Sequence, residues 1–224
     1  SISDADWDID GDMLTNYHEI VLTKTDPRKF DTDNDGRNDG VDDEDRDLLT
    51  NWEECVLTKT DPRDPDSNDN GISDYNDDED GDGLSNGEEI NNYYTDPRKR
   101  DTDNDRLDDF AEVDEYGTSP ILKDTDGDGL DDGVEILDYH TSALLNDTDS
   151  DLLTDWEEVV LCDTDPNNPN SKDEYVSDAD WDSDNDGISN IDELRIWGTL
   201  PNDPDFDDDD LIDGDELILG TDIK

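Results

Sequence analysis

The chain has 224 residues and a formal net charge of -58, because 73 aspartates and glutamates face only 15 lysines and arginines. Hydrophobic residues make up 28%, so even with the glycines added the apolar share stays well below the ~45–50% of ordinary globular domains. Such a chain cannot bury a large core and, without further help, is expected to be disordered. Its charge disfavours nucleic acid and anionic membrane surfaces as partners. The chain has no run of eighteen apolar residues, so no membrane-spanning helix is expected.

One twelve-residue pattern recurs along the whole chain. Its ten copies begin at residues 8, 31, 43, 66, 78, 101, 124, 147, 182 and 205, and nine of the ten have aspartate at positions one, three and five. The steps are 23 or 12 residues, except for one step of 35 that leaves room for a decayed eleventh copy at 170–181. All copies thus fall on one grid of 12-residue loops and 11-residue spacers. This regularity predicts a repeat array in which each unit contacts mainly its neighbours.

The spacers predict short helices. Aliphatic residues such as Ile136-Leu137 directly follow position twelve, and Gly-Thr or Thr-Asp-Pro sequences come next. We expect a helix of one to two turns from position nine or ten into the spacer, ending at the glycine or at the residue before proline. The apolar residue at position seven should pack with nearby spacer residues, aromatic ones included: Trp52, Tyr93, Tyr94, Tyr116, Tyr139, Trp156 and Trp197. The predicted fold is mostly irregular, elongated and solenoid-like, with little or no β-sheet.

Within each loop, the spacing matches an EF-hand-type calcium loop. Side-chain oxygens stand at positions one, three, five, nine and twelve, with a glycine at six and a backbone carbonyl at seven. The longer acid at position twelve can bind with both oxygens, and position nine is expected to hold a bridging water. Magnesium would require a stricter octahedron, so calcium is favoured, at about ten ions per chain.

The predicted ligands at positions one, three, five, seven and twelve follow in chain order. They are Asp8, Asp10, Asp12, Leu14, Glu19; Asp31, Asp33, Asp35, Arg37, Asp42; Asp43, Asp45, Asp47, Leu49, Glu54; Asp66, Asn68, Asn70, Ile72, Asp77; Asp78, Asp80, Asp82, Leu84, Glu89; Asp101, Asp103, Asp105, Leu107, Glu112; Asp124, Asp126, Asp128, Leu130, Glu135; Asp147, Asp149, Asp151, Leu153, Glu158; Asp182, Asp184, Asp186, Ile188, Glu193; and Asp205, Asp207, Asp209, Leu211, Glu216.

Three departures from the pattern carry expectations of their own. Position six is not glycine in five copies, so the turn there must be strained or different. Loops 31–42 and 66–77 end in aspartate and abut the next loop, so Asp42 or Asp77 is placed to bridge two ions. The copy at 170–181 has Lys172 at position three and Trp181 at position twelve. We expect no full-affinity calcium there.

The decayed copy is expected to separate two runs of calcium loops. Residues 1–169 should form one run of calcium loops, 170–181 a hinge, and 182–224 a second run with two loops at 182–193 and 205–216. Limited proteolysis at sub-saturating calcium is expected to cut first within 166–178. First cleavage at any other spacer would contradict this order of stability.

The alternation of joined and spaced loops resembles thrombospondin type 3 repeats, in the cysteine-poor form of bacterial and archaeal surface proteins. The resemblance rests on Asp31-Thr32-Asp33-Asn34-Asp35-Gly36, on residues 124–130, and on the Thr-Asp-Pro spacers. It implies calcium ions along the chain, little regular secondary structure, and an extracellular multidomain protein. The animal repeats are disulfide-linked, whereas this chain has only Cys55 and Cys162, which we expect to be free or intermolecular.

Two classes of function remain open. The first is a calcium-stiffened stalk, spacer or filament element of a secreted or cell-surface protein, with an adhesin as one such protein. The second is an extracellular calcium store or buffer. An enzyme is not expected, because His18 and His140 are isolated and no nucleophile–base pair is indicated. The expected partners are calcium, other protein domains and copies of the chain itself. The chain opens with a string that nearly repeats 176–182, so we read it as a segment of a longer array; its Ile2 and Ser3 lie outside the residues described below.

Overall fold

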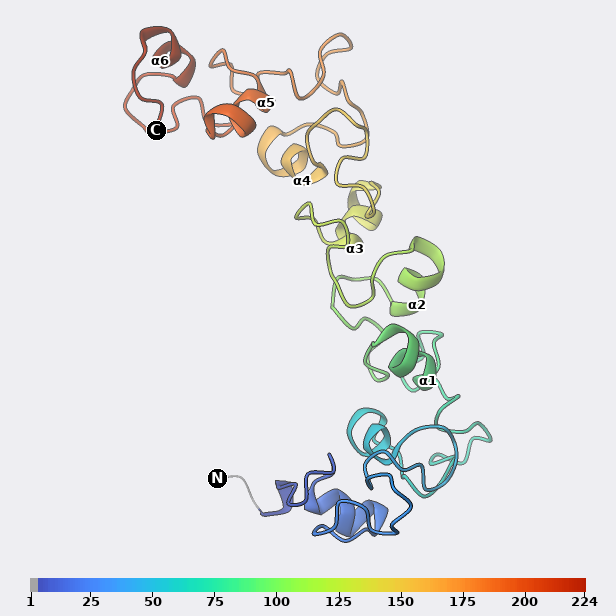
Figure 1. Ribbon diagram of the computed structural model, residues 1–224. Helices are drawn as coiled ribbons and strands as arrows, with labels where there is room; N and C mark the ends of the chain where they lie inside the picture. The colour runs from blue at the N-terminus through green and yellow to red at the C-terminus, as the bar shows by residue number, and fades with distance from the viewer. Residues whose placement is uncertain (1–3) are drawn as a thin grey trace. The chain divides into compact units, whose positions relative to one another are not determined.

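The computed structural model describes residues 4–224 and divides into two compact units. One comprises Ser1–Asp103 with Asp108–Glu115, and the other comprises Asn104–Leu107 with Tyr116–Lys224. Both units consist of loops and short helices in regular alternation (Figure 1). None of the described helices is long and apolar enough to cross a membrane.

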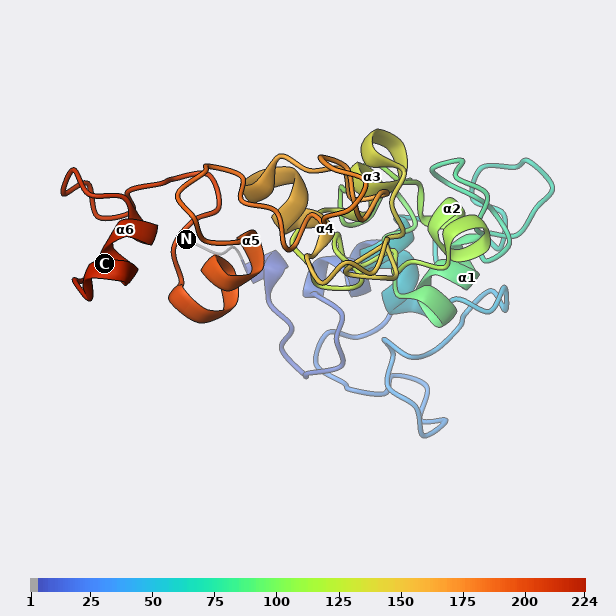
Figure 2. The same cartoon turned by 90° about the horizontal axis from the view of Figure 1, so that it is seen from above.

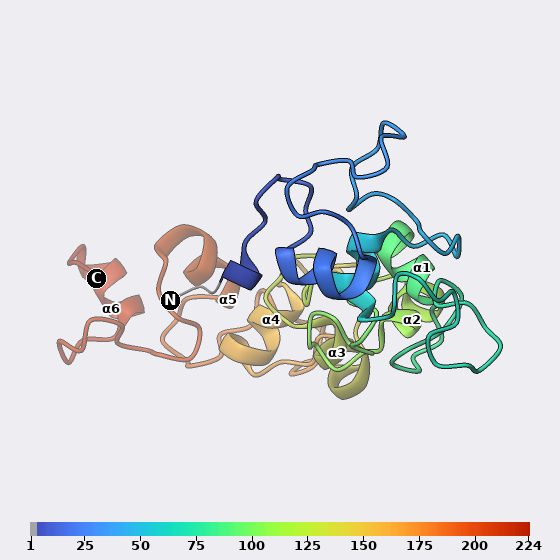
Figure 3. The same cartoon turned by 90° about the horizontal axis from the view of Figure 1, so that it is seen from below.

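The helices are short and recur once per spaced repeat, which confirms the predicted fold class of an irregular repeat array. Figure 2 shows the loops that separate them, and Figure 3 shows the turns of η2 and η3 in blue and cyan. The isolated bridge between Asp173 and Val176 is the one β feature in the described part of the chain. The elements are the 3-10 turn η1 (Asp4–Asp6), the α-helices α1 (Asn86–Glu88), α2 (Asp109–Ala111), α3 (Asp132–Val134), α4 (Asp155–Glu157), α5 (Asn190–Asp192) and α6 (Asp213–Leu219), and the π-helical turns η2 (His18–Thr23), η3 (Glu53–Thr58), η4 (Glu89–Tyr93), η5 (Glu112–Tyr116), η6 (Glu135–Tyr139), η7 (Glu158–Cys162) and η8 (Glu193–Trp197).

Each of α1 to α6 begins at loop position nine, as predicted, and the residue at position eight explains the start in several copies. The Ser85 hydroxyl accepts the N–H of Glu88, whose side chain bonds back to the N–H of Ser85. Thr154 and Glu157 form the same capping box at α4. A side chain that satisfies the free N–H groups of the first turn fixes where a helix starts. The capping residue at position eight therefore fixes the helix start at position nine of the loop.

The helix ends match the prediction where η8 and α6 stop at the left-handed glycines Gly198 and Gly220, but they differ in spacers without glycine. The N–H groups of Tyr94 and Thr95 both donate to the carbonyl of Glu89, at 2.6 and 3.2 Å, which closes a wide π-type turn. The chain then leaves the helix through a left-handed residue, Tyr94, with φ 62°. Lys24, Lys59, His140 and Asp163 end their helices in the same way. The stop in these spacers is therefore one residue before the threonine, and it does not require glycine or the later proline.

The apolar core consists of small separate pieces built around position seven. Seven such residues are at most 7% exposed: Leu14, Leu49, Leu84, Leu107, Leu130, Leu153 and Ile188. In the second unit, Leu153 packs with Cys162 and Ala179. The expectation fails for Ile72, which is 47% exposed. Arg37, the charged residue at position seven of loop 31–42, is exposed as well. The expectation also fails for the aromatic Tyr94, because that side chain is 74% exposed.

Position six shows the strain that the sequence predicts. Met13, Leu48, Arg106, Leu152 and Asp210 all have positive φ, between 74° and 93°. Left-handed backbone at a residue with a Cβ destabilises the folded state by about 1–2 kcal/mol. These loops therefore keep the turn geometry of the glycine copies at a cost in stability.

Glycine at position ten reflects a close approach between loops. A Cβ added to Gly133 would lie 2.2 Å from the carbonyl oxygen of Asp105. We expect Gly133→Ala to destabilise the second unit by about 1–3 kcal/mol through overpacking, seen as a lower melting temperature by circular dichroism at saturating calcium. Gly127→Ala is the control, because no atom lies within 4 Å of its added Cβ although its φ is +82°. Gly127→Ala should lose only about 1–2 kcal/mol, from left-handed backbone alone, and a Gly133→Ala variant that melts at the parent temperature would contradict the contact.

Candidate metal centres

Backbone N–H groups hold the loop aspartates in a ring, as loop 124–135 shows. The two carboxylate oxygens of Asp124 accept the N–H groups of Gly127 and Gly129, at 2.7 and 3.0 Å. Asp126 Oδ1 accepts the N–H of Asp128 at 3.2 Å. Carboxylate oxygens of these aspartates thus accept hydrogen bonds from the loop's own backbone. These bonds hold the side chains in the tight loop that the spacing predicts. The same bonds recur in loop 182–193.

The acid at position twelve is held by a spacer threonine that sequence reasoning treated only as part of a helix stop. The Thr141 hydroxyl donates to Oε1 of Glu135 at 3.1 Å. The same contact joins Thr60 to Glu54, Thr95 to Glu89, Thr164 to Glu158 and Thr199 to Glu193, at 3.1–3.2 Å. The signal was present in the sequence, because a threonine follows each of these glutamates by six residues. The threonine hydroxyl orients the glutamate because it donates to one of the two carboxylate oxygens.

The second carboxylate oxygens are buried and lack a protein donor. In loop 124–135, these are Oδ2 of Asp126 and Oε2 of Glu135. Among the described residues, the same atoms are without a partner in Asp45 and Glu54, Asp80 and Glu89, Asp149 and Glu158, and Asp184 and Glu193. Buried polar atoms normally have a partner. A pair of unpartnered oxygens from positions three and twelve fits an oxygen-coordinated cation such as calcium.

Burial and crowding raise the pKa values of these acids. The pKa of Glu135 is raised to about 8, first by burial and then by the charges of Asp126, Asp128 and Asp155. The pKa of Asp126 is raised to about 6, again chiefly by burial. The ionised forms are therefore unfavourable here unless a positive charge joins them.

Position nine takes part in contacts between loops, whereas the bridging water expected there stays a prediction. In the first unit, the carboxylates of Asp12 and Glu19 gather with Asp39, which is position nine of the next loop, and their oxygens lie within 4.8 Å of one another. All three residues are at most 1% exposed. Asp39 is oriented by Thr32, whose N–H and hydroxyl donate to it at 2.8 and 2.7 Å. Successive loops thus combine their carboxylates in one buried cluster.

The residue type at position nine depends on what precedes the loop. In loops that directly follow another loop, position nine is an asparagine whose amide donates to the carbonyl oxygen at position nine of the preceding loop, as Asn51 does to Asp39 at 2.8 Å. The same bond joins Asn86 to Asp74 and Asn190 to Asp178, at 2.7 and 2.8 Å. In loops that follow a spacer, position nine is aspartate. The choice of amide or acid therefore distinguishes joined loops from spaced loops.

Position five links each loop to the one 23 residues further along. In the second unit, Asp128 Oδ2 accepts the N–H of Trp156 at 2.9 Å. The same contact, between residues 28 apart, joins Asp47 to Tyr75, Asp82 to Phe110, Asp105 to Gly133 and Asp151 to Ala179 at 2.8–3.2 Å. The backbone of each of these later loops is therefore held by a carboxylate of the loop 23 residues before it.

The decayed copy at 170–181 keeps its links to neighbouring loops although it has Lys172 at position three and Trp181 at position twelve. Lys172 Nζ lies 3.4 Å from Asp163, outside the loop. Asp178 remains fully buried and accepts the N–H of Ser171 at 2.9 Å. Its charge is among the causes that raise the pKa of Glu158 in the preceding loop. This loop thus contributes an acid to its neighbour, and the hinge proposed for it stays a prediction.

Comparisons with known proteins agree with the repeat assignment. Residues 78–99, 124–141 and 182–204 match the bacterial TSP3 repeat, so the predicted thrombospondin type 3 repeats are confirmed. Two solved structures share 43% and 42% identity with the matched part and are described as "Biofilm associated protein - BSP domain" and "Biofilm associated protein - B domain". Each match covers 20% of this chain, and 8% and 11% of those chains, with a TM-score of 0.20. The comparison with curated proteins gives no match.

Proposed function

We propose that the chain is a calcium-binding structural segment, a stalk, spacer or filament element of a secreted or cell-surface protein. The observation that carries this proposal is the recurring pair of buried, unpartnered oxygens at positions three and twelve. Calcium would be held by these residues together with the acids at positions one and five. Bound calcium would supply positive charge to balance the 73 acids, for which the chain has only 15 lysines and arginines. Its role here is structural, because its ligands come from segments that have little other packing.

The inter-loop clusters favour a stiffening role over storage. The cluster of Asp12, Glu19 and Asp39 joins two loops, so an ion there would fasten one repeat to the next. A buffer needs many acids but no fixed register between them. An extracellular calcium store remains the alternative.

Small-angle X-ray scattering during a calcium titration separates the two functions. A stalk should reach fixed dimensions that persist once its sites are filled, and it should show a cooperative change in circular dichroism over the same range. A store should take up calcium with gradual changes and no persistent shape. The expected affinity is ~10⁻⁴–10⁻³ M, which is typical of extracellular calcium modules.

Glu135 should matter more to calcium binding than acids outside the loops. Its Oε2 is buried and unpartnered, whereas Glu115 lies exposed in a spacer. We expect Glu135→Gln to lower bound calcium by at least about one ion per chain, because position twelve supplies charge and oxygens to the ion. Glu115→Gln should bind as much calcium as the parent protein. Equilibrium dialysis at equal free calcium measures both, and equal losses would mean that the loop register is wrong.

A further inference from the structure

Loops 31–42 and 66–77 occupy equivalent places in the array, yet they differ at positions three and five. Each is followed directly by another loop, and each ends in aspartate, Asp42 or Asp77. Loop 31–42 has aspartate at positions three and five, whereas loop 66–77 has Asn68 and Asn70. The two loops therefore form a natural matched pair within the first unit.

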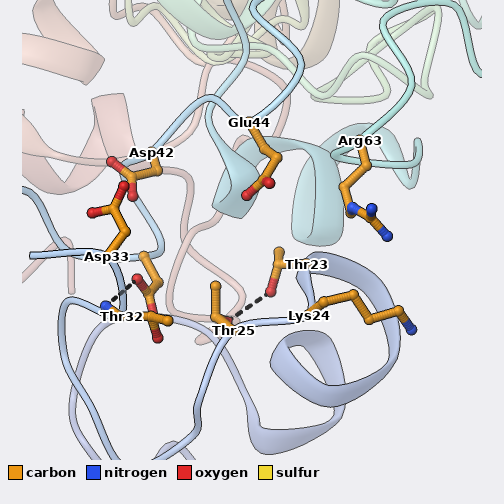
Figure 4. Close-up of a pocket in the computed structure, with 9 residues that line it drawn as sticks. Thr23, Lys24, Thr25, Thr32, Asp33, Asp42, Glu44 and Arg63 are labelled. Atoms are coloured by element: carbon orange, nitrogen blue, oxygen red, sulfur yellow. Dashed lines mark hydrogen bonds between the residues drawn. The ribbon is translucent and has the colours of Figure 1, made fainter. Parts of the chain in front are cut away.

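In loop 31–42, the carboxylates face one another. Asp33 and Asp42 point toward the same space beside Thr32 (Figure 4). The pKa of Asp42 is raised by burial and then by the charges of Asp35 and Asp33, while Arg37 opposes the shift. Arg37 is 55% exposed at its side chain and lies 3.7 Å from Asp42, so it compensates only part of this charge. The arrangement suits a bound cation.

In loop 66–77, the chain supplies its own donors at the corresponding place. The side-chain amides of Asn68 and Asn70 both donate to Oδ2 of Asp77, at 2.6 and 3.0 Å. Their carbonyl oxygens are already used on the backbone, by the N–H groups of Asn70 and Ile72 at 3.0 and 2.7 Å. Nitrogen donors thus stand where the aspartate loops present a second carboxylate oxygen.

Binding an ion here would require both amides to turn. The turn would break the two bonds to Asp77 and the two bonds from backbone N–H groups. The side-chain ligands would carry a charge of only about -2, against about -4 in the other loops, and fewer ligand charges weaken calcium binding. The position-seven residue Ile72 is also exposed, so this loop lacks the packing that anchors the others.

We propose that loop 66–77 is closed by its own amides and not by calcium. It still serves the array through Asp74, which is 2% exposed and whose charge helps to raise the pKa of Glu54 in the preceding loop. The inference rests on the proposed function, because it assumes that calcium fills the other loops.

Bound calcium per full-length chain, measured by equilibrium dialysis at equal free calcium, tests the proposal. Asn68→Asp with Asn70→Asp should add about one ion, because the change restores the aspartate pattern. Asp77→Asn should leave the number of ions unchanged. Asp42→Asn is the matched control and should lose about one ion. Circular dichroism at saturating calcium establishes that each variant folds.

The outcomes separate this inference from the proposed function. A parent chain that binds no calcium at millimolar concentrations would contradict the proposed function itself. A parent chain that binds calcium but loses an ion in Asp77→Asn would overturn only the inference about loop 66–77. The same holds if the double aspartate variant folds and gains no ion.

Discussion

Removal of calcium is expected to expand the protein, and its return to compact the chain cooperatively. In chelator, repulsion among the 73 acids acts on a chain whose core consists of small pieces around position seven. The radius of gyration should then approach or exceed about 50 Å, the value for an unfolded chain of this length. Calcium at ~10⁻⁴–10⁻³ M should reverse the change, because binding free energy is coupled to folding. Small-angle scattering and circular dichroism should report the same transition.

Sodium chloride is the control for general screening. Salt at matched ionic strength weakens repulsion between exposed charges, but it cannot fill the buried oxygen pairs of positions three and twelve. It should therefore compact the chain only partly and without cooperativity. If the chelated protein keeps a sharp thermal transition and unchanged dimensions, the coupling of calcium to folding is wrong.

Local spacing made the loops and the helix starts predictable. The ring around Asp124 needs only residues within five positions, and the cap at Ser85 needs only Glu88, three residues on. Such contacts follow from the chain's own turn geometry, so one sequence contains all the information they require. The same locality explains why position seven could be assigned to the core.

Contacts between loops were not predictable from the pattern of one loop. Asp39 joins Asp12 across 27 residues, and Asp128 accepts from Trp156 across 28. Both contacts depend on how one repeat stacks against the next, which a ligand template for a single loop does not contain. One signal was available: position nine alternates between asparagine and aspartate with the presence of a spacer. That alternation would have indicated that position nine contacts its neighbouring loops.

A strong pH dependence is the second large effect that the structure predicts. Without calcium, burial and neighbouring acids raise the pKa values of Glu54, Glu89 and Glu158 to about 9, from an ordinary value of 4.5. Between pH 4.5 and about 9, the folded chain therefore binds more protons than the unfolded chain. The stability from these groups is fully present below pH 4.5 and is lost as the pH rises through about 9. Calcium replaces those protons where the calcium-free chain is compact and protonated, so its binding near pH 5 should release them.

Two measurements test this linkage between protons and calcium. In chelator, lowering the pH from 8 toward 5 should compact the chain, as scattering would show, because protons then neutralise the buried acids. Calorimetric titrations of calcium near pH 5, where protons keep the calcium-free chain compact, should reveal proton release when they are made in buffers with different ionisation heats. Glu158→Gln should reduce the number of protons released, since it removes one raised carboxyl, whereas the exposed Glu115→Gln should not. Apparent binding heats that are independent of the buffer would show that the acids are already ionised before calcium arrives, which the burial of Glu158 at 0% exposure argues against.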